Sequence, residues 1–98
     1  MQSLMIIGRR WFQRGSGNTY HTATIYVDGK CIHKSEITYG YGEHFLHTAG
    51  EWLEANGYMP ERRHWHNGGA DPLWKYFRDD RGVNYSVETI DVDRKKDL

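Results

Sequence analysis

Histidine is the residue type with the most obvious capacity for chemistry in this chain, because six of the 98 residues are histidines. On a helix, His44, His47 and Glu51 would share a narrow arc, which could present two imidazoles and a carboxylate to one zinc ion. A solvated helix face explains the same spacing, and the chain has neither a His-Glu-x-x-His string nor paired cysteines. We therefore expect a solvated face, with no bound metal and no cofactor.

A second histidine cluster is His64-Trp65-His66. In an extended segment the two histidines share one side and Trp65 faces the other. We interpret Trp65 as an aromatic anchor that pins a long loop to the sheet, with polar flanks.

Nucleophilic and acid–base chemistry have weak candidates. Cys31 lies in a predicted strand, where a cysteine usually behaves as a small buried hydrophobe. His33 would share its face, but nothing marks a third, orienting group. The pair Asp79-Asp80 lacks the apolar surroundings that would raise a carboxyl pKa for acid catalysis. We predict that the protein is not an enzyme.

The run from Arg9 to Arg14, Arg-Arg-Trp-Phe-Gln-Arg, offers binding chemistry instead. Arginines beside exposed rings hold single-stranded nucleic acid by phosphate pairing and base stacking, and the same residue types mark protein–protein hot spots. Thirteen basic and thirteen acidic residues give zero net charge, which weakens the nucleic-acid interpretation, so a protein partner explains the composition at least as well. The expected contact residues are Arg9, Arg10, Trp11, Arg14, Tyr20, His21, Tyr39 and Tyr41.

Strands must position these residues in the first part of the chain. Leu4–Gln13 is apolar and β-branched at its start, and Gly8 indicates a bulge or a close backbone approach. Thr19–Val27 is rich in β-formers, and Asp28-Gly29 predicts a tight hairpin to a partner strand at Lys30–Thr38.

Helical periodicity appears next, from about Glu43 to Asn56. A short helix is predicted over Leu73–Asp80, with Trp74 among its inward-facing residues. A strand is predicted over Val83–Val92. Its apolar residues change from one face to the other along the strand, and a bulge near Glu88 would bring them to the same face. The apolar stripe of the longer helix is Phe45, Leu46, Ala49, Trp52 and Leu53.

The element order β-β-β-α-(short α)-β predicts a single α+β domain over residues 1–98, with a small antiparallel sheet and the main helix packed on one face. Asp93–Leu98 is predicted to be a frayed, charged tail. One cysteine allows no internal disulfide, and Leu4–Ile7 is too short to span a bilayer and lacks the flanks of a signal peptide. We expect a cytoplasmic protein without a membrane partner.

Four motifs carry a resemblance to a known group: Gly8-Arg9-Arg10-Trp11-Phe12, Gly17-Asn18-Thr19-Tyr20-His21, Val27-Asp28-Gly29 and Tyr39-Gly40-Tyr41-Gly42. With them the chain, up to Pro60, resembles small accessory proteins of tailed bacteriophages and prophages, for which no biochemical activity is established. The resemblance implies a phage product in the cytoplasm of a bacterial host. Small phage accessory proteins are often non-enzymatic binders that redirect or inhibit a host enzyme or defence complex.

Two functions follow as expectations. The first is a non-enzymatic module that binds and modulates a host protein of a defence or nucleic-acid-processing complex. The alternative is a single-stranded nucleic-acid-binding protein that uses the same basic and aromatic surface. A homodimer that buries the exposed aromatic rings is a further possibility.

Overall fold

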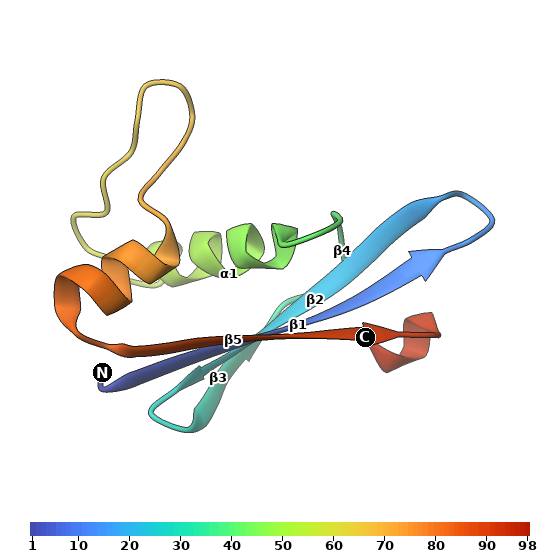
Figure 1. The fold of residues 1–98 in the computed structure, drawn as a ribbon, viewed down its shortest axis with the longest axis horizontal. Coiled ribbons are helices and arrows are strands. Elements are labelled where there is room, and N and C mark those ends of the chain that lie inside the picture. The colour runs from blue at the N-terminus through green and yellow to red at the C-terminus, as the bar shows by residue number, and fades with distance from the viewer.

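The sheet is assembled from strands at both ends of the chain, in a computed structural model that describes all 98 residues (Figure 1). Strand β1 (Ser3–Gln13) pairs antiparallel with β2 (Asn18–Val27), and β2 pairs antiparallel with β3 (Lys30–Lys34). The two-residue strand β4 (Thr38–Tyr39) also pairs with β2. The α+β class predicted from the sequence is confirmed, with the strand order β3-β2-β1-β5.

The last strand, β5 (Asn84–Val92), runs parallel to β1, so the sheet is mixed where the sequence predicted an antiparallel one. The chain reaches β5 at the end where β1 begins, and the amide of Asn84 donates to the carbonyl of Gln2 at 2.9 Å. From that end β5 can only run in the direction of β1. Its register with β1 is continuous, so the bulge predicted near Glu88 is not formed.

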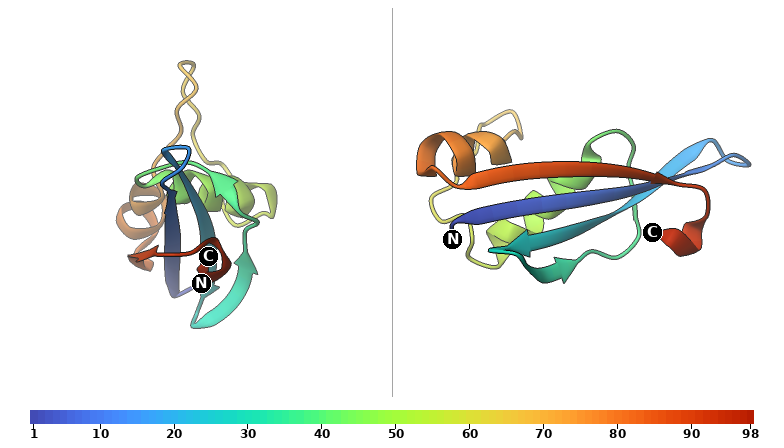
Figure 2. Two further views of the ribbon diagram at one scale, coloured as in Figure 1. Left: turned by 90° about the vertical axis from the view of Figure 1, so that its right-hand side faces the viewer. Right: turned by 60° about the horizontal axis from the view of Figure 1, so that its bottom comes forward.

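Helix α1 (His44–Ala55) covers one face of the sheet (Figure 2). Phe45 packs directly over Gly8, where an added Cβ would lie 2.3 Å from the phenyl ring. Gly8 therefore marks a close approach of helix and strand, and β1 has no bulge against either neighbour. The fully buried members of this layer are Leu4, Ile6, Ala23, Ile25, Phe45, Ala49 and Leu53.

The second helical segment, η1 (Trp74–Asp79), is a π-helix that closes the end of the core. Tyr76 and Phe77 are buried, and the Tyr76 hydroxyl donates to the carbonyl of Pro60 at 2.6 Å. Trp74 was predicted to point inward but is 44% exposed, with the guanidinium of Arg78 over its ring. The π-helix η1 has a wider turn than an α-helix, so its side chains point in other directions than α-helical spacing predicts.

Residues 61–71 form a projecting loop that stands away from the body of the molecule (Figures 1 and 2). The prediction that Trp65 anchors this loop to the sheet is wrong, since Trp65 is 50% exposed and the Gly69 backbone lies against its ring. The loop is held at its base instead. Asp71 is buried, its carboxylate accepts from Arg63 at 2.8 Å, and its carbonyl accepts two bonds from Arg62.

The C-terminal segment, where the charge pattern predicts a frayed tail, forms a turn that packs against the sheet. Residues Lys95–Asp97 form a 3-10 turn, η2, and Leu98 is buried. Lys34 of β3 donates its Nζ proton to the carbonyl of Leu98 at 2.9 Å, which fixes the segment against the sheet. None of the helices combines the length and apolar character needed to cross a membrane.

Candidate functional site

Strand alternation divides the expected contact residues between the two faces of the sheet. Successive side chains of a strand point to opposite faces. Gly8 faces α1, so Arg10 lies on the α1 side, whereas Arg9 and Trp11 lie on the opposite side, which we call the open face. The basic and aromatic run of β1 is therefore two half-surfaces rather than one.

Three aromatic rings meet on the open face, at the end of the sheet next to the β1–β2 hairpin. Trp11 of β1 is directly opposite Tyr20 of β2, and Tyr20 is opposite Tyr39 of β4. The ring centroids of Trp11 and Tyr20 are 5.9 Å apart with planes inclined by 29°, and those of Tyr20 and Tyr39 are 5.8 Å apart at 74°. The cross-strand register thus sets the three rings in a row.

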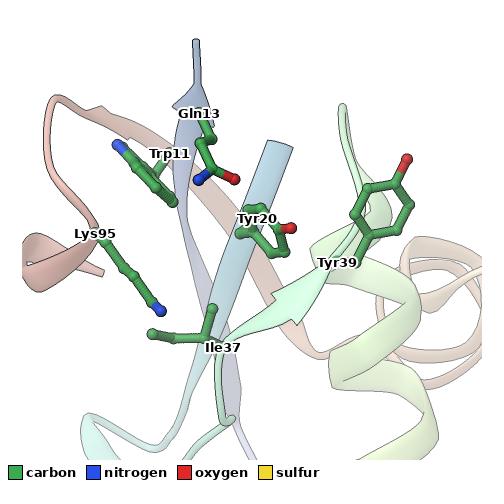
Figure 3. Close-up of a pocket in the computed structure, with 6 residues that line it drawn as sticks. All are labelled: Trp11, Gln13, Tyr20, Ile37, Tyr39 and Lys95. Carbon is green, nitrogen blue, oxygen red and sulfur yellow. The ribbon is translucent and has the colours of Figure 1, made fainter. Parts of the chain in front are cut away.

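These rings line a cleft of about 440 Å³, which we call the ring cleft (Figure 3). Trp11 and Tyr20 are half-buried and form its aromatic walls, while Tyr39 is 59% exposed at its side. The remaining lining residues are Gln13, Ile37 and Lys95, and the last is the only charged one. The cleft can therefore stack a planar group, donate hydrogen bonds and neutralise an anion.

The basic residues nearest the ring cleft lack internal partners. Arg9, Arg14 and Lys95 form no ion pair within the chain, whereas Arg94 pairs with Asp97 at 3.2 Å. An unpaired guanidinium or ammonium at the surface is available for an external carboxylate or phosphate.

Arg10, one of the expected contact residues, forms a network of internal bonds. Its guanidinium donates to both oxygens of Asp91 at 2.7 and 3.1 Å and to the carbonyl of Gly42 at 3.0 Å. The hydrogen bond to Asp91 raises the pKa of Arg10, and the same bond lowers the pKa of the Asp91 carboxyl. Arg10 therefore ties β5 to the loop before α1.

His21 was expected at the surface and is instead completely buried. Its Nδ1 lies 3.1 Å from the carbonyl of Gly40 and its Nε2 lies 2.8 Å from Oγ1 of Thr48. Burial lowers its pKa, the bond to Gly40 opposes that shift, and the neighbouring His44 adds to it. His21 therefore supports the loop between β4 and α1 from beneath the helix.

The other expected contacts lie outside the ring cleft. Tyr41 is 76% exposed in the loop before α1, and Arg14 is exposed in the β1–β2 hairpin. Sequence reasoning also missed three lining residues. Gln13 could have been found from its period-two spacing with Trp11, but Ile37 and Lys95 arrive through the irregular β3–β4 connection and the C-terminal turn, which no local pattern indicates.

The helix histidines and the cysteine lie elsewhere. His44, His47 and Glu51 are exposed, and Nε2 of His47 is 2.8 Å from the Glu51 carboxylate. No three His, Cys, Asp or Glu side chains are grouped closely enough to hold a metal ion. Cys31 is exposed beside the β2–β3 hairpin, contrary to its predicted burial, because β3 is an edge strand there.

Comparison with known proteins identifies no relative. The chain matches no protein-family model, no curated protein and no solved structure.

Proposed function

We propose that this chain is a non-enzymatic binding protein and that the ring cleft is the place where it holds a host macromolecule. The observation that carries the proposal is the row of Trp11, Tyr20 and Tyr39, which three different strands bring to one open cleft. Large rings left accessible on a rigid sheet are typical of binding hot spots.

The lining of the cleft supports binding rather than catalysis. No carboxylate, histidine or cysteine lines it, so it lacks the pairs of groups that usually transfer protons or activate a nucleophile. Its aromatic rings provide apolar contact area, and its amide and ammonium groups provide hydrogen bonds and charge. Binding sites typically combine these features.

The biological setting is part of the same proposal. The opening motifs resemble those of phage accessory proteins, and such a protein would act in the bacterial cytoplasm on a defence or nucleic-acid-processing complex. A host protein is the first partner class expected, and a single-stranded nucleic acid is the alternative.

A photo-crosslinking residue tests the location of the partner site. It is placed at Ile37, which lines the cleft and is 45% exposed, and for comparison at Glu51, which is exposed on α1. In host cells we expect a specific adduct from position 37 that Trp11→Ala removes, and none from position 51. Equal adducts from both positions, or none from position 37, would contradict the proposal.

A further inference from the structure

We infer that the partner segment entering the ring cleft is a single-stranded nucleic acid, one base of which stacks on the Trp11 and Tyr20 rings. This inference rests on the proposed function, because it names the chemistry of the partner at that same cleft. A protein segment is the alternative that the experiment below must distinguish.

The ring arrangement fits a base. Trp11 and Tyr20, from two paired strands, are stacked with ring centroids 5.9 Å apart and planes inclined by 29°, and both rings line the cleft. Tyr39 stands at 74° to Tyr20 and forms a wall beside that surface (Figure 3). Bases of every type have a π-face, and stacking on protein rings is the usual way of holding single strands.

The charge around the cleft fits a phosphate backbone. Lys95 is the one charged lining residue, and no carboxylate lines the cleft. Arg9 lies two residues from Trp11 on the same face, Arg14 lies just past the end of β1, and neither has an acidic partner. The zero net charge describes the whole molecule, whereas Arg9, Arg14 and Lys95, at or beside this cleft, form no ion pair within the chain.

Gln13 adds a polar contact without strong selectivity. Its amide lies beside Trp11 and Tyr20 in the cleft, and its Oε1 already accepts from the Ser16 hydroxyl at 2.8 Å. The amide nitrogen remains as a donor, and each of the four bases has acceptor atoms at its edge. We therefore expect binding that tolerates changes of base.

An unpaired strand fits better than a duplex. Trp11 and Tyr20 are half-buried in a cleft of about 440 Å³ that β1, β2, β4 and the C-terminal turn line. A base paired within a duplex is already stacked on both sides and cannot offer its face to a ring, whereas an unpaired base can.

The test is a titration of the full chain with fluorescent oligothymidylate of about sixteen nucleotides, the upper end of the site sizes known for small single-strand-binding folds. A duplex of the same length and thymidine monophosphate are the comparison ligands. We expect the single strand to bind at least about ten-fold more tightly than the duplex or the mononucleotide, since only the strand offers an accessible base together with neighbouring phosphates.

Matched substitutions locate the contact. Trp11→Ala should weaken binding at least about five-fold, as loss of one stacking ring does. Tyr39→Ala removes the wall beside the base and should also weaken binding, by about five-fold. Trp65→Ala removes an exposed ring outside the cleft and should change affinity less than two-fold. Tyr39 is mainly exposed, so its variant remains informative if Trp11→Ala fails to fold. Lys95→Ala should lower the slope of log affinity against log salt by about 0.7, and Lys30→Ala at the opposite end of β2 should not.

The outcomes separate the inference from the proposed function. Absence of oligonucleotide binding at low salt, or equal losses in the cleft and control variants, overturns the inference. If a protease-sensitive, nuclease-resistant adduct still forms from position 37, the cleft remains the partner site and its partner is a protein. If no adduct forms and no oligonucleotide binds, both proposals fail.

Discussion

The covered and open faces of the sheet are built from the same strands and have opposite properties. On the covered face, Leu4 and Ile25 are completely buried beneath α1. On the open face, Trp11 and Tyr20 remain half-accessible around a cleft. One face of this small domain is therefore buried in the core, while the other keeps aromatic rings accessible, because strand alternation places neighbouring residues on opposite faces.

Even the buried residues of the open face differ from those of the covered face. Thr22 and Thr24 are nearly inaccessible, yet neither hydroxyl has a hydrogen-bond partner. On the covered face, His21 is buried with both ring nitrogens bonded. The buried hydroxyls of the open face therefore lack the hydrogen bonds that stabilise the buried His21 side chain beneath α1.

The largest effect we expect is the loss of a leucine from the covered face. Leu53 is fully buried, so Leu53→Ala should lower the free energy of unfolding by about 2–5 kcal/mol. Leu46 is only half-buried, and its truncation should cost less. Ile37→Ala on the open face should stay within about 0.5 kcal/mol of the parent protein. Urea unfolding followed by circular dichroism measures all three, and equal costs for Leu53 and Ile37 would contradict the division of the faces.

The next effect comes from the close approach of β1 and α1. Gly8→Ala would place a methyl group 2.3 Å from the Phe45 ring, so helix and strand must separate. We expect a loss of about 1–3 kcal/mol in the free energy of unfolding, the usual cost of overpacking. Gly15→Ala is the matched control, because open space surrounds that position. A Gly8→Ala protein as stable as the control would show that the ring can move aside.

The sequence predicted elements with strong local signals. The Asp28-Gly29 turn, where Asp28 has a positive φ of 50°, joins β2 to β3 as expected, and the stripe of α1 packs on the sheet. The direction of β5 was not predictable, because its strand pattern is the same for a parallel and an antiparallel neighbour. The loop and η1 return the chain to the end of the sheet where β1 begins, and this position determines the direction of β5.

The candidate site was predictable only in part, for a similar reason. Trp11, Tyr20 and Tyr39 were expected as contacts, and the structure brings all three together. His21 was not separable from them by sequence, because its burial depends on Thr48 and Gly40, which local patterns do not connect to it. Long-range pairing thus decides which polar residues remain available.

A smaller effect, of opposite sign, is expected on the open face. Thr24→Val replaces a buried, unpaired hydroxyl by a methyl group of similar shape, which should raise the free energy of unfolding by about 1 kcal/mol. Thr48→Val removes the hydroxyl that lies 2.8 Å from His21 and should lower it by a similar amount. Chemical denaturation of both variants gives the two signs, and destabilisation by Thr24→Val would mean that its hydroxyl has a partner in solution.

The smallest effect is the contribution of His21 to the pH dependence of the free energy of unfolding. A change of pH, unlike a substitution, removes no packing atoms. Burial lowers the pKa of His21 in the folded protein, whereas the unfolded chain has the ordinary value of about 6.5. Below that pH the unfolded chain binds a proton that the folded protein resists, so this contribution to stability is present above about pH 6.5 and is lost as the pH falls. His44 also faces His21, with ring centroids 5.5 Å apart, and its electrostatic effect lowers the pKa of His21 further. Urea unfolding across this range should show a shallower fall in stability for His21→Gln than for the parent, and an unchanged fall for His66→Gln in the projecting loop. An identical pH profile for His21→Gln and the parent would show that protonation of this buried ring does not weaken the covered face.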